Sequence, residues 1–227
     1  MDFSFNEDQI AIRDLAHQIF SDRTTDEFML NFDRNDTAYD DVLWGTLAEQ
    51  GLLGITIAEE LGGTNLGFTE LCLVLEEQGR HVSPIPLFSN LVLGALPIDE
   101  FGTIEQKHKS LTPLAGGTFK LTAAIAEMGM AQASTGQINA IPNGNTWTLN
   151  GTLECVPDSA VADAIIVPAS HDGNRMLFIV DTDSAGLAID SQRSSLGVNE
   201  GTLLLDGVEL GADAVLGGVD QGSVILA

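Results

Sequence analysis

The chain has 227 residues, 44% of them hydrophobic, and its nine Lys and Arg against 33 Asp and Glu give a net charge of −24. This apolar fraction excludes a disordered chain, and no apolar run reaches the roughly 20 residues that span a bilayer. So acidic a surface also argues against nucleic acid or anionic membranes as partners, because both bind through clustered cations.

The amino terminus and the cysteines favour a cytoplasmic protein. The first eight residues are acidic, whereas a signal peptide begins with basic residues. Cys72 and Cys155 lie in different expected elements. A disulfide framework is therefore not expected, and both thiols are expected to be buried.

The first 117 residues have the pattern of helices. Asn6 and Gln9 have the spacing of a capping box, and the apolar residues that follow lie on one helical face. Thr103 and Gln106 form a second capping-box pattern, which opens a short helix, and Pro113 and Gly116-Gly117 are expected to end the helical half. Further helices are expected over residues 26–32, 40–50, 69–78 and 87–96.

From residue 119 the pattern changes to short strands separated by Gly, Asn, Asp and Pro. Trp147 and Leu149 alternate with polar residues, and Asn150-Gly151 is the typical centre of a type I′ turn, which predicts a β-hairpin over residues 145–158. Evenly spaced short strands indicate a sandwich or barrel. The predicted fold class is α+β, with an all-α domain over 1–117, an all-β domain over 118–220 and the start of a further helix over 221–227.

A motif for chemistry is not evident from the residues alone. The four histidines are far apart and lack metal-site spacing, so no metal site is expected, and Gly-x-Ser-x-Gly is absent. The glycine-rich stretch 61–67 does not end in the Lys-Ser/Thr of a phosphate-binding loop, and a turn between helices is the simpler interpretation.

Several short segments together carry a family resemblance. Two of them are Leu75-Glu-Glu-Gln-Gly-Arg80 and Leu205-Asp-Gly-Val208, and the others lie at residues 44–54, 58–63, 101–107, 149–152, 160–163 and 212–217. In their order and spacing along nearly the whole chain, they resemble the acyl-CoA dehydrogenases, a flavoprotein family. Pro84-Ile-Pro86 further resembles a branch that acts on bulky acyl-CoA esters such as steroid side chains.

The resemblance implies an oxidoreductase of lipid metabolism that uses FAD. Members of the family oxidise the Cα–Cβ bond of an acyl-CoA thioester: a carboxylate removes the α-proton, and the β-hydrogen leaves as hydride to the flavin. That base belongs to a C-terminal helical bundle, which is expected to be absent from these residues, so no catalytic residue is assigned. A homo- or hetero-oligomer with an acyl-CoA dehydrogenase subunit is expected.

The resemblance also places a flavin site on residues that depart from the family pattern. Backbone groups of Ile125 and Ala126 would bond the ring. Cys155, Val156 and Pro157 occupy the positions of a signature that supplies an aromatic backing and a hydroxyl. These positions are interpreted as a degenerate FAD site.

The expected path of the substrate has changed as well. Ala131 and Gln132 lie near the path of the acyl-CoA pantetheine in this alignment, and Gln132 replaces a serine of the family signature. Two hypotheses follow. The chain is an FAD-dependent acyl-CoA dehydrogenase subunit, or it is a degenerate, non-catalytic subunit or fragment that completes or stabilises a partner subunit. Both can hold together, since some branches of the family pair an active with an inactive subunit.

Overall fold

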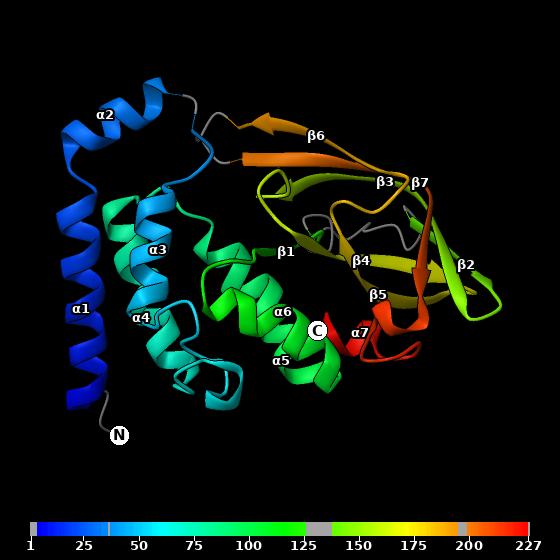
Figure 1. Cartoon of the computed structure of the whole chain (residues 1–227), viewed down its shortest axis with the longest axis horizontal. Coiled ribbons are helices and arrows are strands. Elements are labelled where there is room, and N and C mark those ends of the chain that lie inside the picture. Colours follow the sequence, from blue (N-terminus) through cyan, green and yellow to red (C-terminus); the bar gives the residue numbers. More distant parts are fainter. Residues whose placement is uncertain (1–3, 36, 126–137, 195–198, 227) are drawn as a thin grey trace. The chain divides into compact units, whose positions relative to one another are not determined.

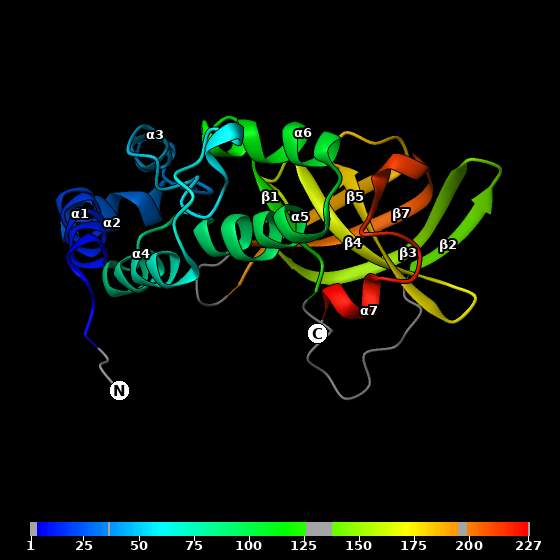
Figure 2. The ribbon, with the colours of Figure 1, turned by 90° about the horizontal axis from the view of Figure 1, so that it is seen from below.

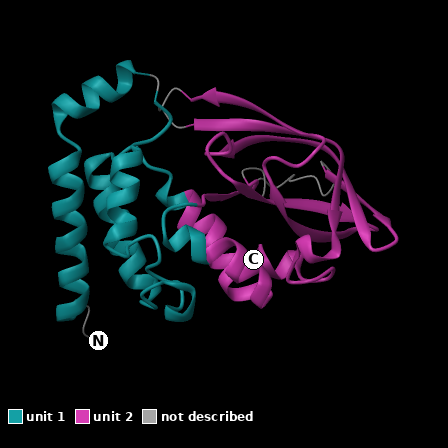
Figure 3. Ribbon diagram, viewed as in Figure 1, with its two compact units in different colours: residues 1–88, 112–118 teal, residues 89–111, 119–227 magenta. Residues whose placement is uncertain are grey.

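The computed structural model describes residues 4–35, 37–125, 138–194 and 199–226 (Figure 1). The chain folds into two compact units, residues 1–88 with 112–118 and residues 89–111 with 119–227 (Figure 3). Helices dominate the first half and strands the second, which confirms the predicted α+β class. The segment 89–111 groups with the strands, whereas the sequence placed a boundary at about residue 117.

The first unit is a set of packed helices. Its elements are α1 (Glu7–Arg23), α2 (Asp26–Arg34), α3 (Asp41–Glu49), the 3₁₀ turn η1 (Glu59–Leu61) and α4 (Phe68–His81). The predicted capping box is confirmed, because Gln9 N donates to Asn6 Oδ1 at 2.8 Å and Asn6 N donates to Gln9 Oε1 at 3.1 Å. The buried core of this unit includes Phe20, Leu43, Leu47, Leu71 and Val74. None of the helices that the structure describes is both long and apolar enough to span a membrane.

Three further helical segments precede the first strand. The π-helix η2 (Ser89–Ala95) continues directly into α5 (Leu96–Phe101), and α6 (Ile104–Ala115) follows. The second capping box is also confirmed, with Gln106 N donating to Thr103 Oγ1 at 3.2 Å and Thr103 N donating to Gln106 Oε1 at 3.0 Å. Pro113 lies inside α6, and the helix ends at Ala115, directly before Gly116-Gly117, where the helical half was expected to end.

The second unit contains one eight-stranded mixed sheet (Figure 2). Its main path runs β6-β7-β3-β2-β4-β5-β8, and β1 pairs in parallel with β4. A core of apolar side chains, among them Leu149, Val156, Phe178 and Leu203, packs within the unit. The bounds are β1 (Leu121–Ala123), β2 (Ile138–Asn143), β3 (Thr146–Pro157), β4 (Ala164–His171), β5 (Asn174–Asp181), β6 (Leu187–Arg193), β7 (Asn199–Gly211), η3 (Ala212–Ala214), β8 (Val215–Leu216) and α7 (Gly222–Ile225).

The turn of the hairpin lies at Gly144-Asn145, six residues before the predicted turn at Asn150-Gly151. β2 and β3 pair antiparallel around Gly144 and Asn145, and Gly144 has a positive φ of 61°, which suits the first central position of a type II′ turn. The predicted turn at Asn150-Gly151 is wrong, since both residues lie inside β3. The pairing of β3 with β7 shifts there, and Gly151 has a φ of 141°. Asn150 therefore faces two residues of β7, Asp206 and Gly207, so the site of the predicted turn is a β-bulge whose extra residue lies on β7.

Candidate functional site

An apolar cavity of about 230 Å³ lies in the strand-containing unit. It is lined from η2 and α5, from the residues after β1, from β4 and β5, and from α7. The lining residues are Val92, Leu93, Pro97, Ala123, Ile125, Ile166, Leu177, Ile225 and Leu226. All of these side chains are apolar, so the cavity suits a hydrocarbon group and offers no charge for a polar ligand.

The wall formed by η2 is fixed to β1 through a buried amide. Leu121 N donates to Asn90 Oδ1 at 2.6 Å, and Asn90 is only 1% exposed. Because this bond is formed away from water, it holds the helix and the strand at one separation. Helix and strand together position Val92 and Ala123 at the cavity.

Ile125 is the predicted flavin contact that the structure places beside this cavity. Within the described residues its backbone N–H and C=O make no hydrogen bond, whereas the preceding Ala124 N donates to Ile166 O at 2.9 Å. No other described residue therefore occupies the backbone groups of Ile125. The other predicted residues of this region, Ala126, Ala131 and Gln132, lie outside the described residues.

The second predicted flavin segment lies at the end of β3, where a further bulge changes which way its side chains point. The register with β7 shifts between Leu153 and Val156, and Cys155 has a φ of 56°. Because the bulge breaks the alternation, Glu154 and Cys155 are both exposed, while Val156 is fully buried in the core. Val156 therefore cannot present its side chain to a ligand.

Pro157 is the last residue of this segment, and its backbone carbonyl already has a hydrogen-bond partner. Its carbonyl oxygen accepts a hydrogen bond from Thr122 Oγ1 at 2.7 Å, and proline has no N–H to donate.

The expectation of buried thiols is corrected for both cysteines, since Cys72 and Cys155 are exposed. Cys155 is exposed because of the bulge, and Cys72 because it lies on the outer face of α4.

Asp158, directly after this segment, is a partly buried carboxyl in an uncommon backbone conformation. Its φ is 51°, and Ser89 Oγ donates to its Oδ2 at 2.6 Å. Burial raises the pKa of Asp158 above its ordinary value, and the hydrogen bond from Ser89 offsets only part of that rise. The end of β3 thus carries a carboxyl whose charged form is disfavoured in the folded chain.

Replacing Asp158 by Asn is expected to stabilise the chain at pH 7. The raised pKa means that the folded state binds more protons than the unfolded state above the ordinary value of about 3.9. The stability that Asp158 contributes is thus present below that value and is lost as the pH rises toward the raised folded pKa. Asn still accepts from Ser89 and tolerates a positive φ. We expect Tm to rise by about 2–4 °C at pH 7, about 1 kcal/mol for this size, with a smaller gain near pH 4.

The matched control is Asp172→Asn, because Asp172 is exposed and also has a positive φ, of 48°. Thermal unfolding of both variants between pH 4 and 8 separates the burial of a charge from the backbone preference. An equal gain in the two variants, independent of pH, would contradict the role of burial at Asp158.

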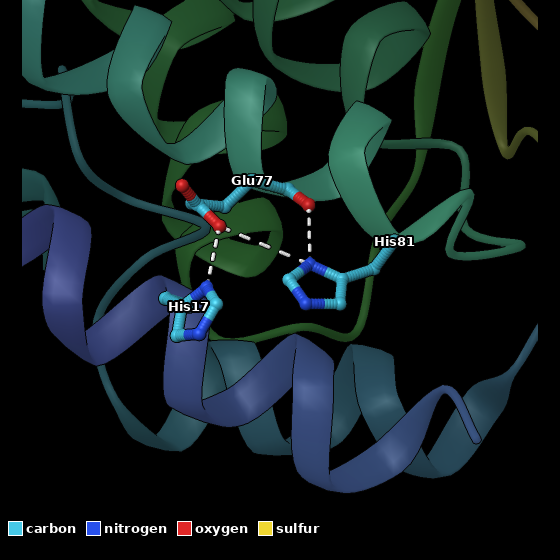
Figure 4. A group of neighbouring side chains, drawn as sticks. All are labelled: His17, Glu77 and His81. Atoms are coloured by element: carbon cyan, nitrogen blue, oxygen red, sulfur yellow. Dashed lines mark hydrogen bonds and ion pairs between the residues drawn. The ribbon is translucent and has the colours of Figure 1, made fainter.

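Sequence reasoning missed a cluster in the helical unit. Although no metal-site spacing was found, the structure brings His17 and His81 together at Glu77 (Figure 4). Glu77 and His81 are four residues apart on α4, so their shared face could have been noticed. His17 comes from α1, 60 residues before Glu77, and no local pattern connects the two. The other histidines lie apart from this cluster: His108 is exposed on α6, and His171 Nδ1 lies 3.2 Å from Ala140 O.

Known proteins provide an independent comparison. Residues 6–118 match the family described as "Acyl-CoA dehydrogenase, N-terminal domain". Acyl-CoA dehydrogenase FadE27 of Mycobacterium tuberculosis is 29% identical over 221 residues, which cover 97% of this chain and 58% of that protein.

Two solved structures extend the likeness through the strands. A variant of the steroid ACAD Tcur3481-Tcur3483 has 35% identity and a TM-score of 0.86, covering 97% of this chain and 60% of that chain. The ChsE4-ChsE5 complex from Mycobacterium tuberculosis has 30% identity and a TM-score of 0.89, covering 99% and 61%. This chain thus spans about three fifths of the length of these three proteins.

Proposed function

The chain belongs to the acyl-CoA dehydrogenase family, and we propose that it acts as a subunit that binds acyl-CoA and supports assembly without catalysing on its own. The observation that carries this proposal is the geometry at the end of β3. Cys155 points outward on a bulge, Val156 is buried and the Pro157 carbonyl is already bonded. A flavin ring finds neither an aromatic face nor a hydroxyl on these three residues.

The described residues therefore fit FAD, the cofactor of this family, poorly. The backbone of Ile125 is the one predicted contact whose hydrogen-bonding groups no other described residue occupies. Each missing hydrogen bond costs about 1 kcal/mol, and a missing aromatic contact costs a comparable amount. A Kd of about 1 μM corresponds to a binding free energy of only about 8 kcal/mol. A few such losses therefore weaken FAD binding to the millimolar range or beyond.

A second candidate function is FAD-dependent α,β-dehydrogenation of an acyl-CoA thioester, with FAD as the hydride acceptor. The apolar cavity favours it, because hydrocarbon-lined space of about 230 Å³ lies beside Ile125. An acyl chain in the cavity and a flavin at Ile125 would then be neighbours. This alternative requires the flavin contacts to come from residues beyond Cys155, Val156 and Pro157.

The comparisons also support proposals for the partner subunit and for the acyl group of the substrate. A solved neighbour described as a complex supports association with a second acyl-CoA dehydrogenase subunit, and a steroid-type neighbour supports a bulky acyl group. The net charge of −24 favours neither nucleic acid nor an anionic membrane as partner. The cytoplasmic location stays a prediction.

We expect the purified chain to be colourless and FAD to leave its Tm unchanged. The measurements are the flavin absorbance of the protein as isolated and a thermal unfolding series with added FAD. The double variant Cys155→Trp, Pro157→Thr restores an aromatic residue and a hydroxyl at the end of β3 and should gain FAD affinity relative to the wild type. A yellow wild-type chain with about one FAD per protein would overturn the non-catalytic proposal and favour the second candidate.

A further inference from the structure

We propose that His17, Glu77 and His81 form a binding site for a divalent transition-metal ion such as Zn²⁺ or Ni²⁺ within the helical unit. Two imidazoles and one carboxylate are a ligand set that such ions accept, with water completing the coordination. This site is separate from the cavity and the β3 segment, and it does not depend on the proposed function.

The three side chains already converge on one point (Figure 4). His17 Nδ1 lies 2.9 Å from Glu77 Oε2, and His81 Nδ1 lies 3.8 Å from the same oxygen. One candidate ligand atom from each residue lies within 4.8 Å of the others. Ligands at about 2.0–2.1 Å from a tetrahedral ion are about 3.4 Å apart, so small side-chain rotations bring all three into range.

Two packed helices present the three side chains of the cluster. Glu77 and His81 are presented by the same face of α4, and His17 comes from α1, which packs on α4 in the same unit. The side chain of Glu77 is only 4% exposed. Ligands on packed helices keep their geometry better than ligands on loops, and this lowers the ordering cost of binding.

The electrostatics around Glu77 also favour a cation. Burial raises the pKa of Glu77, but the hydrogen bond from His17 and the nearby Arg80 outweigh it, so the net shift is downward and the carboxylate is charged. Arg80 Nε binds the other oxygen, Oε1, at 3.1 Å, and Arg80 Nη2 binds Glu76 at 2.9 Å. The Oε2 atom is therefore left to the two imidazoles.

Space and charge for the remaining ligands are present next to the cluster. A pocket of about 340 Å³ is lined by His17 and Glu77, and also by Asp14, Glu76, Arg13 and Arg80. Three carboxylates face two guanidinium groups in this pocket, so a negative charge is in excess. Water can enter to complete the coordination of an ion.

One hydrogen bond must change when an ion binds. His81 Nδ1 lies 2.9 Å from the carbonyl oxygen of Glu77, and because a carbonyl only accepts, this nitrogen carries a proton here. His81 becomes a ligand when that proton moves to Nε2 and the ring turns toward Oε2. The ion likewise replaces the proton between His17 and Glu77, so binding competes with protons and weakens in acid.

The test is calorimetric titration of the tag-free, chelator-treated full chain with Zn²⁺ and with Ni²⁺. We expect one ion per chain, and a Tm higher by about 5–10 °C at a hundredfold excess over Kd, because the ion binds only the folded state. His17→Gln and His81→Gln should each weaken binding at least about tenfold. The matched control, His108→Gln, removes an exposed histidine on α6 and should leave binding unchanged.

The variants also guard against indirect effects. Circular dichroism and Tm without metal show whether each variant is folded, and His17→Gln is the safer replacement because the side chain of His17 is 55% exposed. A wild-type chain that binds no ion would overturn the proposal. So would binding that survives the loss of both His17 and His81, since the ion would then lie on surface carboxylates.

Discussion

Replacing Asp40 by Ala is expected to lower the free energy of unfolding by about 2–4 kcal/mol, because it removes an N-cap and the buried acceptor of an ion pair whose arginine side chain is 36% exposed. Asp40 is 3% exposed and precedes α3. Arg23, the last residue of α1, donates to it twice, from Nε to Oδ2 at 2.6 Å and from Nη2 to Oδ1 at 2.8 Å. This bidentate pair joins the end of one helix to the start of another.

Asp40 also caps α3, which adds to the loss. Its Oδ1 accepts from Val42 N and Leu43 N, both at 3.2 Å, so the alanine variant leaves these donors and the Arg23 guanidinium without their acceptor. Removing an N-cap alone costs about 1 kcal/mol. In a chain of this size the combined loss corresponds to a Tm lower by about 4–16 °C.

Two controls separate the ion pair from the cap. Asp40→Asn keeps an oxygen that can cap α3 and removes the charge, so the difference from Asp40→Ala isolates the cap. Asp41→Ala removes an exposed carboxylate from the first turn of the same helix and should cost no more than about 1 kcal/mol. If Asp40→Ala and Asp41→Ala unfold at the same urea concentration, the buried pair does not stabilise the unit.

Features that depend on residues three or four apart were predictable from the sequence. Asn6 with Gln9 and Thr103 with Gln106 both form the capping boxes that their spacing indicated. The hairpin was not predictable in the same way. Asn150-Gly151 has the strongest local turn signal, yet β7 continues alongside β3 past this point and Gly207 N donates to Asn150 Oδ1 at 2.8 Å. Pairing with a strand more than 50 residues away decided the outcome.

In the candidate site, too, what depends on distant parts of the chain could not be predicted from the sequence. The resemblance pointed to the end of β3 as a flavin site, which stays a prediction, and it could not show that a bulge buries Val156 and exposes Cys155. Ala126, Ala131 and Gln132 fall outside the described residues and stay predictions. The cluster at Glu77 depends on the packing of α1 against α4, so His17 could not be assigned to it from sequence.

Replacing Gly94 by Ala is expected to destabilise the strand-containing unit and to distort the apolar cavity. A Cβ atom at Gly94 would lie 2.3 Å from the Cβ of Leu121, far below ordinary contact. Leu121 cannot move this atom by side-chain rotation, because Cβ is fixed to the backbone, and its N–H is held by Asn90 at 2.6 Å. Only separation of η2 from β1 relieves the contact.

The expected net loss is about 1–3 kcal/mol, the usual cost of overpacking a core. Gly79→Ala is the matched control, because Gly79 is also helical and a Cβ there meets nothing within 4 Å. That variant should be neutral or gain up to about 1 kcal/mol from helix propensity. Urea unfolding of the two variants measures the difference, and equal stabilities would contradict the close packing of η2 on β1.

The same pair of variants tests the cavity as an acyl site. Val92 and Leu93 flank the close approach on one side, and Ala123 lies just beyond Leu121 on the other, so a wider separation changes the cavity walls. If the cavity holds the acyl chain, folded Gly94→Ala should bind a long-chain acyl-CoA more weakly than Gly79→Ala in a calorimetric titration at low temperature. Unchanged affinity in a measurably destabilised Gly94→Ala would mean that acyl-CoA binds elsewhere, because the cavity wall and the packing of η2 on β1 are formed by the same residues.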